Sequence, residues 1–168
     1  MDQYQFEISP NEIISFDNLE LIDEYTYLYV FHADKIPPHI GVVANGLFYS
    51  VKANSIDLDL SISKINSLIE RKKICTLIFE INRTPQTSIK QLFNDIDGKI
   101  NTGETCLTPI SNAYYINGKH TKIGELLSDL DTDRNVVKTY GAFLPKNFKG
   151  IHNYSSREIN ERINKLRG

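Results

Sequence analysis

The chain has two cysteines and four histidines, residue types that can act as a nucleophile and a base. Cys106 lies just before Thr108-Pro109, a pair suited to cap and begin a helix. A thiol near a helix N-terminus has a lowered pKa, so more of it is the nucleophilic thiolate. Cys106 is therefore the candidate nucleophile. The alternative is that Cys106 only packs in the core, as a small buried hydrophobic residue. Cys75 lies in the apolar run 74–79, which predicts an inert core cysteine.

The candidate base is His39, which begins the segment His39-Ile40-Gly41-Val42-Val43. A histidine at the start of a strand, beside a glycine that leaves space, can be packed and still reachable. Imidazole is the side chain best suited to accept a proton near neutral pH. The alternative is a half-exposed histidine at a strand edge, without a function.

The order of these residues along the chain resembles a known family. His39-Ile40-Gly41-Val42, followed by the glycine turn and strand 45–50, is similar to the first motif of the circularly permuted NlpC-type papain-like cysteine peptidases and amidases, which include the lecithin retinol acyltransferase-like proteins. Cys106 and the residues to Tyr115 resemble the family's nucleophile and its helix, and the segment 143–148 resembles its late proline-containing loop. The resemblance covers about residues 26–150 in order.

The resemblance implies a cysteine-dependent amidase, acyl hydrolase or acyltransferase. His39 would deprotonate Cys106, and the thiolate would attack an amide or ester carbonyl. Ser50 stands near the place where the family carries a polar group that orients the imidazole, with Asn54 and Asp57 beyond it, although a hydroxyl orients an imidazole weakly. Pro109 is unusual so soon after a nucleophile. The competing hypothesis is a non-catalytic protein-interaction module of α+β fold, in which Cys106 and His39 are structural.

Two further groups of residues resemble metal ligands. Asp129-x-Asp131-x-Asp133-x-Asn135 begins like a calcium loop, but Arg134 stands at the position of the required glycine and Tyr140 at that of the bidentate glutamate. We interpret this segment as a solvated turn after a helix. His32, Asp34 and His39 have no recognised ligand spacing. We therefore expect no metal and no cofactor.

The elements that position these residues alternate between strands and helices. Apolar, β-rich runs predict strands at 25–31, 39–44, 47–51, 74–81 and 136–144. Helical spacing and capping residues predict helices at about 61–72, 85–95 with Gly98 just past its end, from 108, around 123–130, and at 156–166. The fold class expected is α+β: one domain at 25–168, with an antiparallel sheet, an early hairpin and packed helices, after a loosely structured cap at 1–24.

The hairpin decides where His39 points. Asn45-Gly46 favours a two-residue type I′ turn, which pairs Val42 with Tyr49 and, by extension, His39 with Lys52. We expect the face with Ile40, Val42, Tyr49 and Val51 to pack inward, because it is the more apolar. His39 and Ser50 would then share the more polar face.

Composition limits the classes of function. A chain of 168 residues that is 40% hydrophobic and 24% charged fits one globular domain. A net charge of -2 makes nucleic acid an unfavourable partner. No apolar run approaches the ~20 residues of a membrane span, and the first basic residue is Lys35, so no secretory signal is evident. We expect a cytoplasmic protein whose partner is an amide or ester substrate, or another protein.

Overall fold

The computed structural model describes residues 3–52, 54–96, 106–116, 118 and 120–167. Within this part of the chain, a mixed sheet of seven strands has the order β2-β8-β7-β3-β4-β5-β6. Neighbouring strands are antiparallel except β2 and β8, which are parallel. The strands of this sheet are β2 (Ile13–Ser15), β3 (Thr26–Phe31), β4 (His39–Ala44), β5 (Leu47–Val51), β6 (Ile56–Ser61), β7 (Thr76–Ile81) and β8 (Val136–Ala142).

A smaller sheet and the helices complete the fold. β1 (Tyr4–Glu7) pairs with β9 (Gly150–His152) in an antiparallel ribbon. The segment 1–24, predicted to be a cap, thus contributes β1 and the edge strand β2. The helices are α1 (Ile62–Lys72), α2 (Ile89–Ile96), α3 (Thr108–Tyr114), α4 (Ile123–Thr132) and α5 (Ser156–Arg167), with short 3-10 turns η1 (Pro10–Glu12) and η2 (Phe16–Asn18). The α+β class is confirmed.

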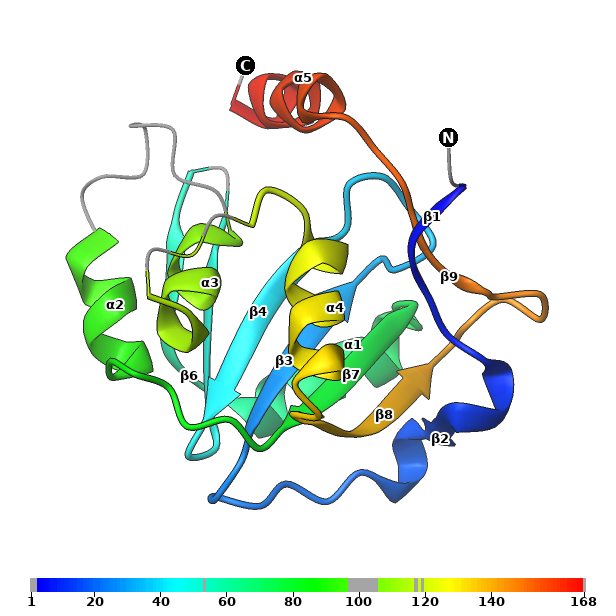
Figure 1. Ribbon diagram of the computed structural model, residues 1–168, viewed down its shortest axis with the longest axis horizontal. Coiled ribbons are helices and arrows are strands. Elements are labelled where there is room, and N and C mark those ends of the chain that lie inside the picture. The colour runs from blue at the N-terminus through cyan, green and yellow to red at the C-terminus, as the bar shows by residue number, and fades with distance from the viewer. Residues whose placement is uncertain (1–2, 53, 97–105, 117, 119, 168) are drawn as a thin grey trace.

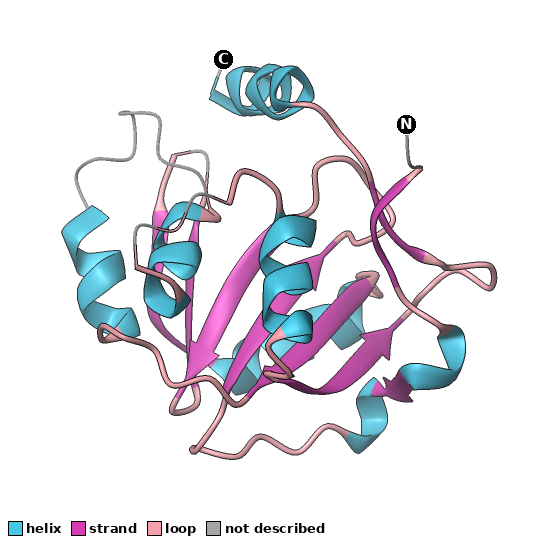
Figure 2. Cartoon of the chain, viewed as in Figure 1, coloured by secondary structure: helices cyan, strands magenta, loops and turns pink. Residues whose placement is uncertain are grey.

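Helices cover both faces of the large sheet (Figures 1 and 2). α2, α3 and α4 lie on one face, over a first core cluster that contains Ile40, Val42 and Leu77. α1 lies on the other face, over a second core cluster that contains Phe31, Val43 and Phe48. β4 separates the two clusters, because successive side chains of a strand point to opposite faces.

The predicted hairpin turn is confirmed. Asn45 and Gly46 both have positive φ, 52° and 74°, as a type I′ turn requires. The pairs Ala44–Leu47, Val43–Phe48 and Val42–Tyr49 form as predicted. The ladder between β4 and β5 ends there, so the further pairs that we predicted, which include His39 with Lys52, are not part of it.

The predicted faces of the hairpin are confirmed on one side only. Ile40, Val42, Tyr49 and Val51 all belong to the first core cluster. The opposite face is not the polar surface that we expected, since Ser50 is 0% exposed. The reason is α1, whose apolar stripe covers this face and forms the second core cluster with the sheet.

Capping side chains mark the starts of α2 and α5. Ser155 and Glu158 exchange the two hydrogen bonds of a capping box at the start of α5. α2 begins at Ile89, later than predicted, because the Ser88 hydroxyl accepts from the Gln91 amide at 3.4 Å and caps the helix there. Gly98, predicted to end this helix, lies outside the described residues.

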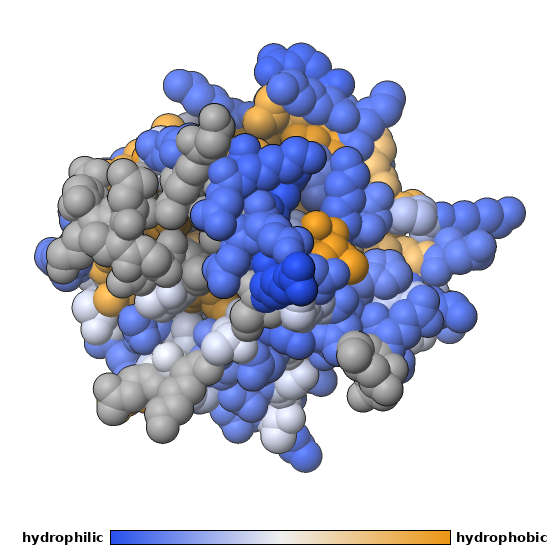
Figure 3. Space-filling view, turned by 90° about the horizontal axis from the view of Figure 1, so that it is seen from above, coloured by the Kyte–Doolittle hydropathy of each residue, from blue (hydrophilic) through white to orange (hydrophobic). Residues whose placement is uncertain are grey.

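The surface around α5, at the top of Figure 1, is mainly hydrophilic, with hydrophobic patches between polar side chains (Figure 3). Among the described helices, none is long and apolar enough to cross a membrane.

Candidate functional site

Cys106 lies beside the first residues of β4, far from its own place in the sequence. Its thiol receives a hydrogen bond from the backbone of Ile40, and its side chain packs against the first core cluster. α3 begins only at Thr108, and Leu107 is its N-cap residue. Cys106 thus precedes the first turn of the helix, so the dipole effect that we predicted is weakened.

The structure therefore differs from the prediction of an acidic thiol. Burial raises the pKa of the Cys106 thiol, and the hydrogen bonds from the backbone of Ile40 and of Cys106 itself oppose this only in part. The thiol of Cys106 is therefore neutral at pH 7. Cys75 is also protonated, because burial raises the pKa of its thiol to about 12.

His39 is the first residue of β4 and is half-buried. Its ring stacks on the ring of Phe31, the residue of β3 with which His39 is paired, and the ring centroids are 5.8 Å apart. Burial lowers the pKa of His39 to about 4; the charge of Asp57 opposes this, and those of Lys52 and His32 add to it. The imidazole is therefore neutral at pH 7, in the form that can accept a proton.

Ser50 lies on the same side of the sheet as His39, at the edge where β5 meets β6. Its hydroxyl donates to an Asp57 carboxylate oxygen at 2.8 Å, and Lys52 forms an ion pair with the other oxygen at 2.9 Å. The hydroxyl proton of Ser50 is thus donated to Asp57. Among the described contacts, no hydrogen bond joins Ser50 to His39. Asp57, which lies beyond Ser50 in the sequence as a further candidate for the orienting group, is the charged group near His39 that favours its protonated form.

The three predicted site residues are brought to one end of β4 but not into one hydrogen-bonded group. Cys106 contacts the backbone of Ile40, the residue directly after His39, so both candidates lie near the same end of β4, but the side chains of Ile40 and His39 point to opposite faces of the sheet. Their side chains pack against different clusters, Cys106 with α3 and His39 with Phe31. The structure shows no hydrogen bond between them within its described part.

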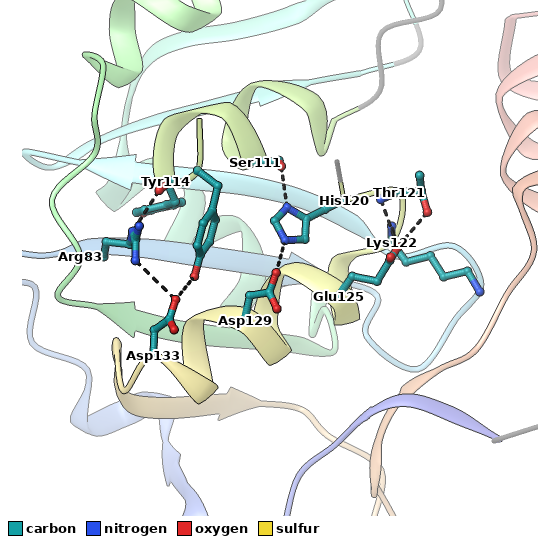
Figure 4. Close-up of polar contacts among 10 residues, drawn as sticks. Arg83, Ser111, Tyr114, His120, Thr121, Lys122, Glu125, Asp129 and Asp133 are labelled. Carbon is teal, nitrogen blue, oxygen red and sulfur yellow. Dashed lines mark hydrogen bonds and ion pairs between the residues drawn. The ribbon is translucent and has the colours of Figure 1, made fainter. Parts of the chain in front are cut away.

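A second polar group lies between α3 and α4, and sequence reasoning missed it (Figure 4). The Ser111 hydroxyl and Nδ1 of His120 are 2.7 Å apart, and Nε2 of His120 lies 2.7 Å from Oδ2 of Asp129. Ser111 is 1% exposed, whereas the side chain of Asp129 is 59% exposed. A nucleophilic serine needs the opposite arrangement, with an accessible hydroxyl and a buried acid. This group is therefore not a hydrolase triad.

Two of the acids that resembled a calcium loop, Asp129 and Asp133, have other partners here. Asp133 accepts from the Tyr115 hydroxyl at 2.7 Å and forms an ion pair with Arg83 at 3.5 Å. Arg83 also lies over the Tyr115 ring, 4.3 Å from its centroid. Asp129 is bonded to His120 (Figure 4). Across the described ranges, no three His, Cys, Asp or Glu side chains group closely enough to hold a metal ion.

A hollow of about 580 Å³ opens beside His120. Side chains of α4 and of the segment that precedes it line this hollow, among them Tyr115, Glu125 and Asp129. Oε1 of Glu125 accepts from the backbone amides of Thr121 and Lys122, which closes the first turn of α4. Glu125, one of the lining residues, is thus fixed by hydrogen bonds within the protein.

Comparison of the chain with family models, curated proteins and solved structures gives no match.

Proposed function

We propose that this protein is a cysteine-dependent acyl hydrolase or acyltransferase of the permuted papain-like type, with Cys106 as nucleophile and His39 as base. One observation carries the proposal: the Cys106 thiol contacts the backbone of Ile40, the neighbour of His39, although Ile40 and Cys106 lie 66 positions apart in the sequence. The order and the residue types are those of the motifs that resemble this family.

The electrostatics set the form of the mechanism. The resting thiol is protonated and the imidazole is neutral, so the site begins as an uncharged pair rather than as a thiolate with an imidazolium. His39 would take the proton as the sulfur attacks the acyl carbon of an amide or ester. His39 would return that proton to the departing amine or alcohol, leaving a thioester on Cys106. Water or an acceptor nucleophile, deprotonated by His39, would then release the acyl group and restore the thiol.

Asp57 is the acid that this mechanism would use indirectly. Its negative charge favours the protonated form of His39, which forms during attack, and Ser50 and Lys52 hold its carboxylate in place. Asp57 is thus proposed as a positioning and electrostatic group, and Ser50 as the hydroxyl that fixes Asp57.

The second candidate function is the non-catalytic interaction module. The observation that favours it is the packing of Cys106 and His39 against different core clusters, together with the raised pKa of the thiol. In that case the thiol is a core group, and a protected thiol does not acquire an acyl group.

An activated ester separates the two candidates. We expect p-nitrophenyl acetate to release a burst of about one equivalent of p-nitrophenolate per chain, with the acetyl group on the peptide that contains Cys106. Cys106→Ser should abolish the burst, His39→Asn should slow it, and Cys75→Ser, the matched buried-thiol control, should leave it unchanged. Acetylation of lysines alone, without acetyl on Cys106, would refute the enzymatic function and leave the interaction module.

A further inference from the structure

We propose that His120 is a positioning residue of the Cys106 site, an inference that rests on the function proposed above. His120 lies in the segment between α3 and α4, and its side chain is 9% exposed. One ring nitrogen is bonded to Ser111 of α3 and the other to Asp129 of α4, each at 2.7 Å (Figure 4). The imidazole thus ties the helix that follows Cys106 to a helix that packs across the same sheet face.

The tie reaches Cys106 through the backbone of α3. Ser111, in the middle of this helix, donates its amide proton to the carbonyl of Leu107 at 2.9 Å. Leu107 directly follows Cys106 and is 5% exposed in the first core cluster. A displacement of Ser111 therefore moves the peptide that carries the thiol.

Other bonds hold the far end of the helix. Nε of Arg83 donates to the Tyr114 carbonyl at 2.9 Å, and the Gln86 amide donates to the Ala113 carbonyl at 2.7 Å. Neither bond acts on the first turn of α3, nearest Cys106. His120 holds the middle of the helix through Ser111, so it contributes to the orientation of the first turn.

The packing around Ser111 supports a fixed rather than a reactive hydroxyl. A Cβ at Gly118 would lie 2.1 Å from Oγ of Ser111, so the chain just before His120 passes directly against that hydroxyl. Ser111 is sealed from solvent, while Asp129 is open to it. The hydrogen-bonded chain therefore anchors a buried helix to the surface and does not prepare Ser111 for attack.

Replacing His120 by asparagine or by glutamine tests its hydrogen bonds to Ser111 and to Asp129 one at a time. In His120→Asn, the amide oxygen can replace Nδ1 and accept from Ser111. In His120→Gln, the amide nitrogen can replace Nε2 and donate to Asp129, but the contact with Ser111 is lost. Ser111→Ala removes the same contact from the other side.

The first readout is the rate at which p-nitrophenyl acetate acetylates Cys106 in the folded protein. We expect His120→Gln and Ser111→Ala to slow it at least about fivefold, the factor that one buried hydrogen bond is worth. His120→Asn should restore it to within about twofold of the wild type. A merely structural role would lower the stability of the variants and leave the rate of the folded protein unchanged, and that result would overturn the proposal.

A second readout does not need Cys106 to react. Hydrogen exchange of the Ser111 amide reports how firmly α3 is held at Leu107. We expect faster exchange in His120→Gln than in His120→Asn. Equal exchange in both variants and the wild type would overturn the positioning role. Absence of acetylation in the wild type, with the expected exchange pattern, would instead refute the proposed function and leave His120 as the residue that positions α3.

Discussion

Acidification should destabilise the wild-type protein more than a variant in which His39 cannot ionise. Burial lowers the pKa of His39 from 6.5 to about 4 in the folded state. Between these pH values the unfolded chain binds a proton that the folded chain does not, so stability is fully present above pH 6.5 and is lost as pH falls towards 4. A pKa difference of about 2.5 corresponds to about 3 kcal/mol at pH 4.

The assay is urea unfolding of the wild type and of His39→Asn at pH 7, 6, 5 and 4. Other groups also titrate in this range, but their contributions cancel in the difference between the two proteins. We expect that difference to change by about 3 kcal/mol from pH 7 to pH 4. His32→Asn serves as a comparison: His32 is exposed and its pKa is lowered in the same direction, so its difference should be smaller. Parallel curves for wild type and His39→Asn would refute the neutral, desolvated imidazole on which the base role depends.

Substitutions at three glycines test the backbone conformation and the packing of the fold by urea unfolding. Gly46→Val should cost more than about 1 kcal/mol, since φ is +74° there, while Gly46→Asn should cost much less; equal effects would contradict the type I′ turn. Gly41→Ala should cost about 1–3 kcal/mol, because its Cβ would lie 2.4 Å from the buried Phe48 ring; a neutral effect would show that this face is loosely packed. Gly150→Ala should also cost about 1–3 kcal/mol, as its Cβ would lie 2.1 Å from the Phe6 carbonyl oxygen; an unchanged midpoint would argue against the β1–β9 pairing.

The elements that the sequence predicts correctly are those with short-range chemical signals. Asn45-Gly46 defines its turn because both residues tolerate positive φ, and Ser155 and Glu158 define the start of α5 by bonding to each other's amides. The register of the first hairpin pairs follows from the turn alone.

Strands without such local signals are harder to predict. β1 depends on β9, almost the whole chain away, and neither is apolar or long enough to indicate a strand alone. β6 contains an irregularity at Asp59, where φ is 52°, so Leu58 packs in the first core cluster and Leu60 in the second. Because of this change of face, buried and exposed side chains do not alternate regularly along β6, and the sequence does not show the pattern that indicates a strand.

The candidate site was predictable as residue types but not as contacts. Spacing indicated Cys106 and His39, and the proximity of Cys106 to Ile40 depends on how α3 packs across the sheet. The raised thiol pKa follows from burial, which the position before Thr108 does not reveal. Ser111, His120 and Asp129 come from three successive segments, and no spacing rule joins them.

The most direct test of the proposed function compares one reaction in two states of the same chain. The rate of acetylation of Cys106 by p-nitrophenyl acetate at pH 7 is measured in the folded protein and in urea, with Cys75 in the same sample as the internal reference. Cys75 should react more slowly in the folded state, because it is buried and its thiol pKa is raised to about 12. If His39 activates Cys106, folding should accelerate the acetylation of Cys106 while it slows that of Cys75. Slowing of both thiols by folding would contradict a catalytic role for Cys106.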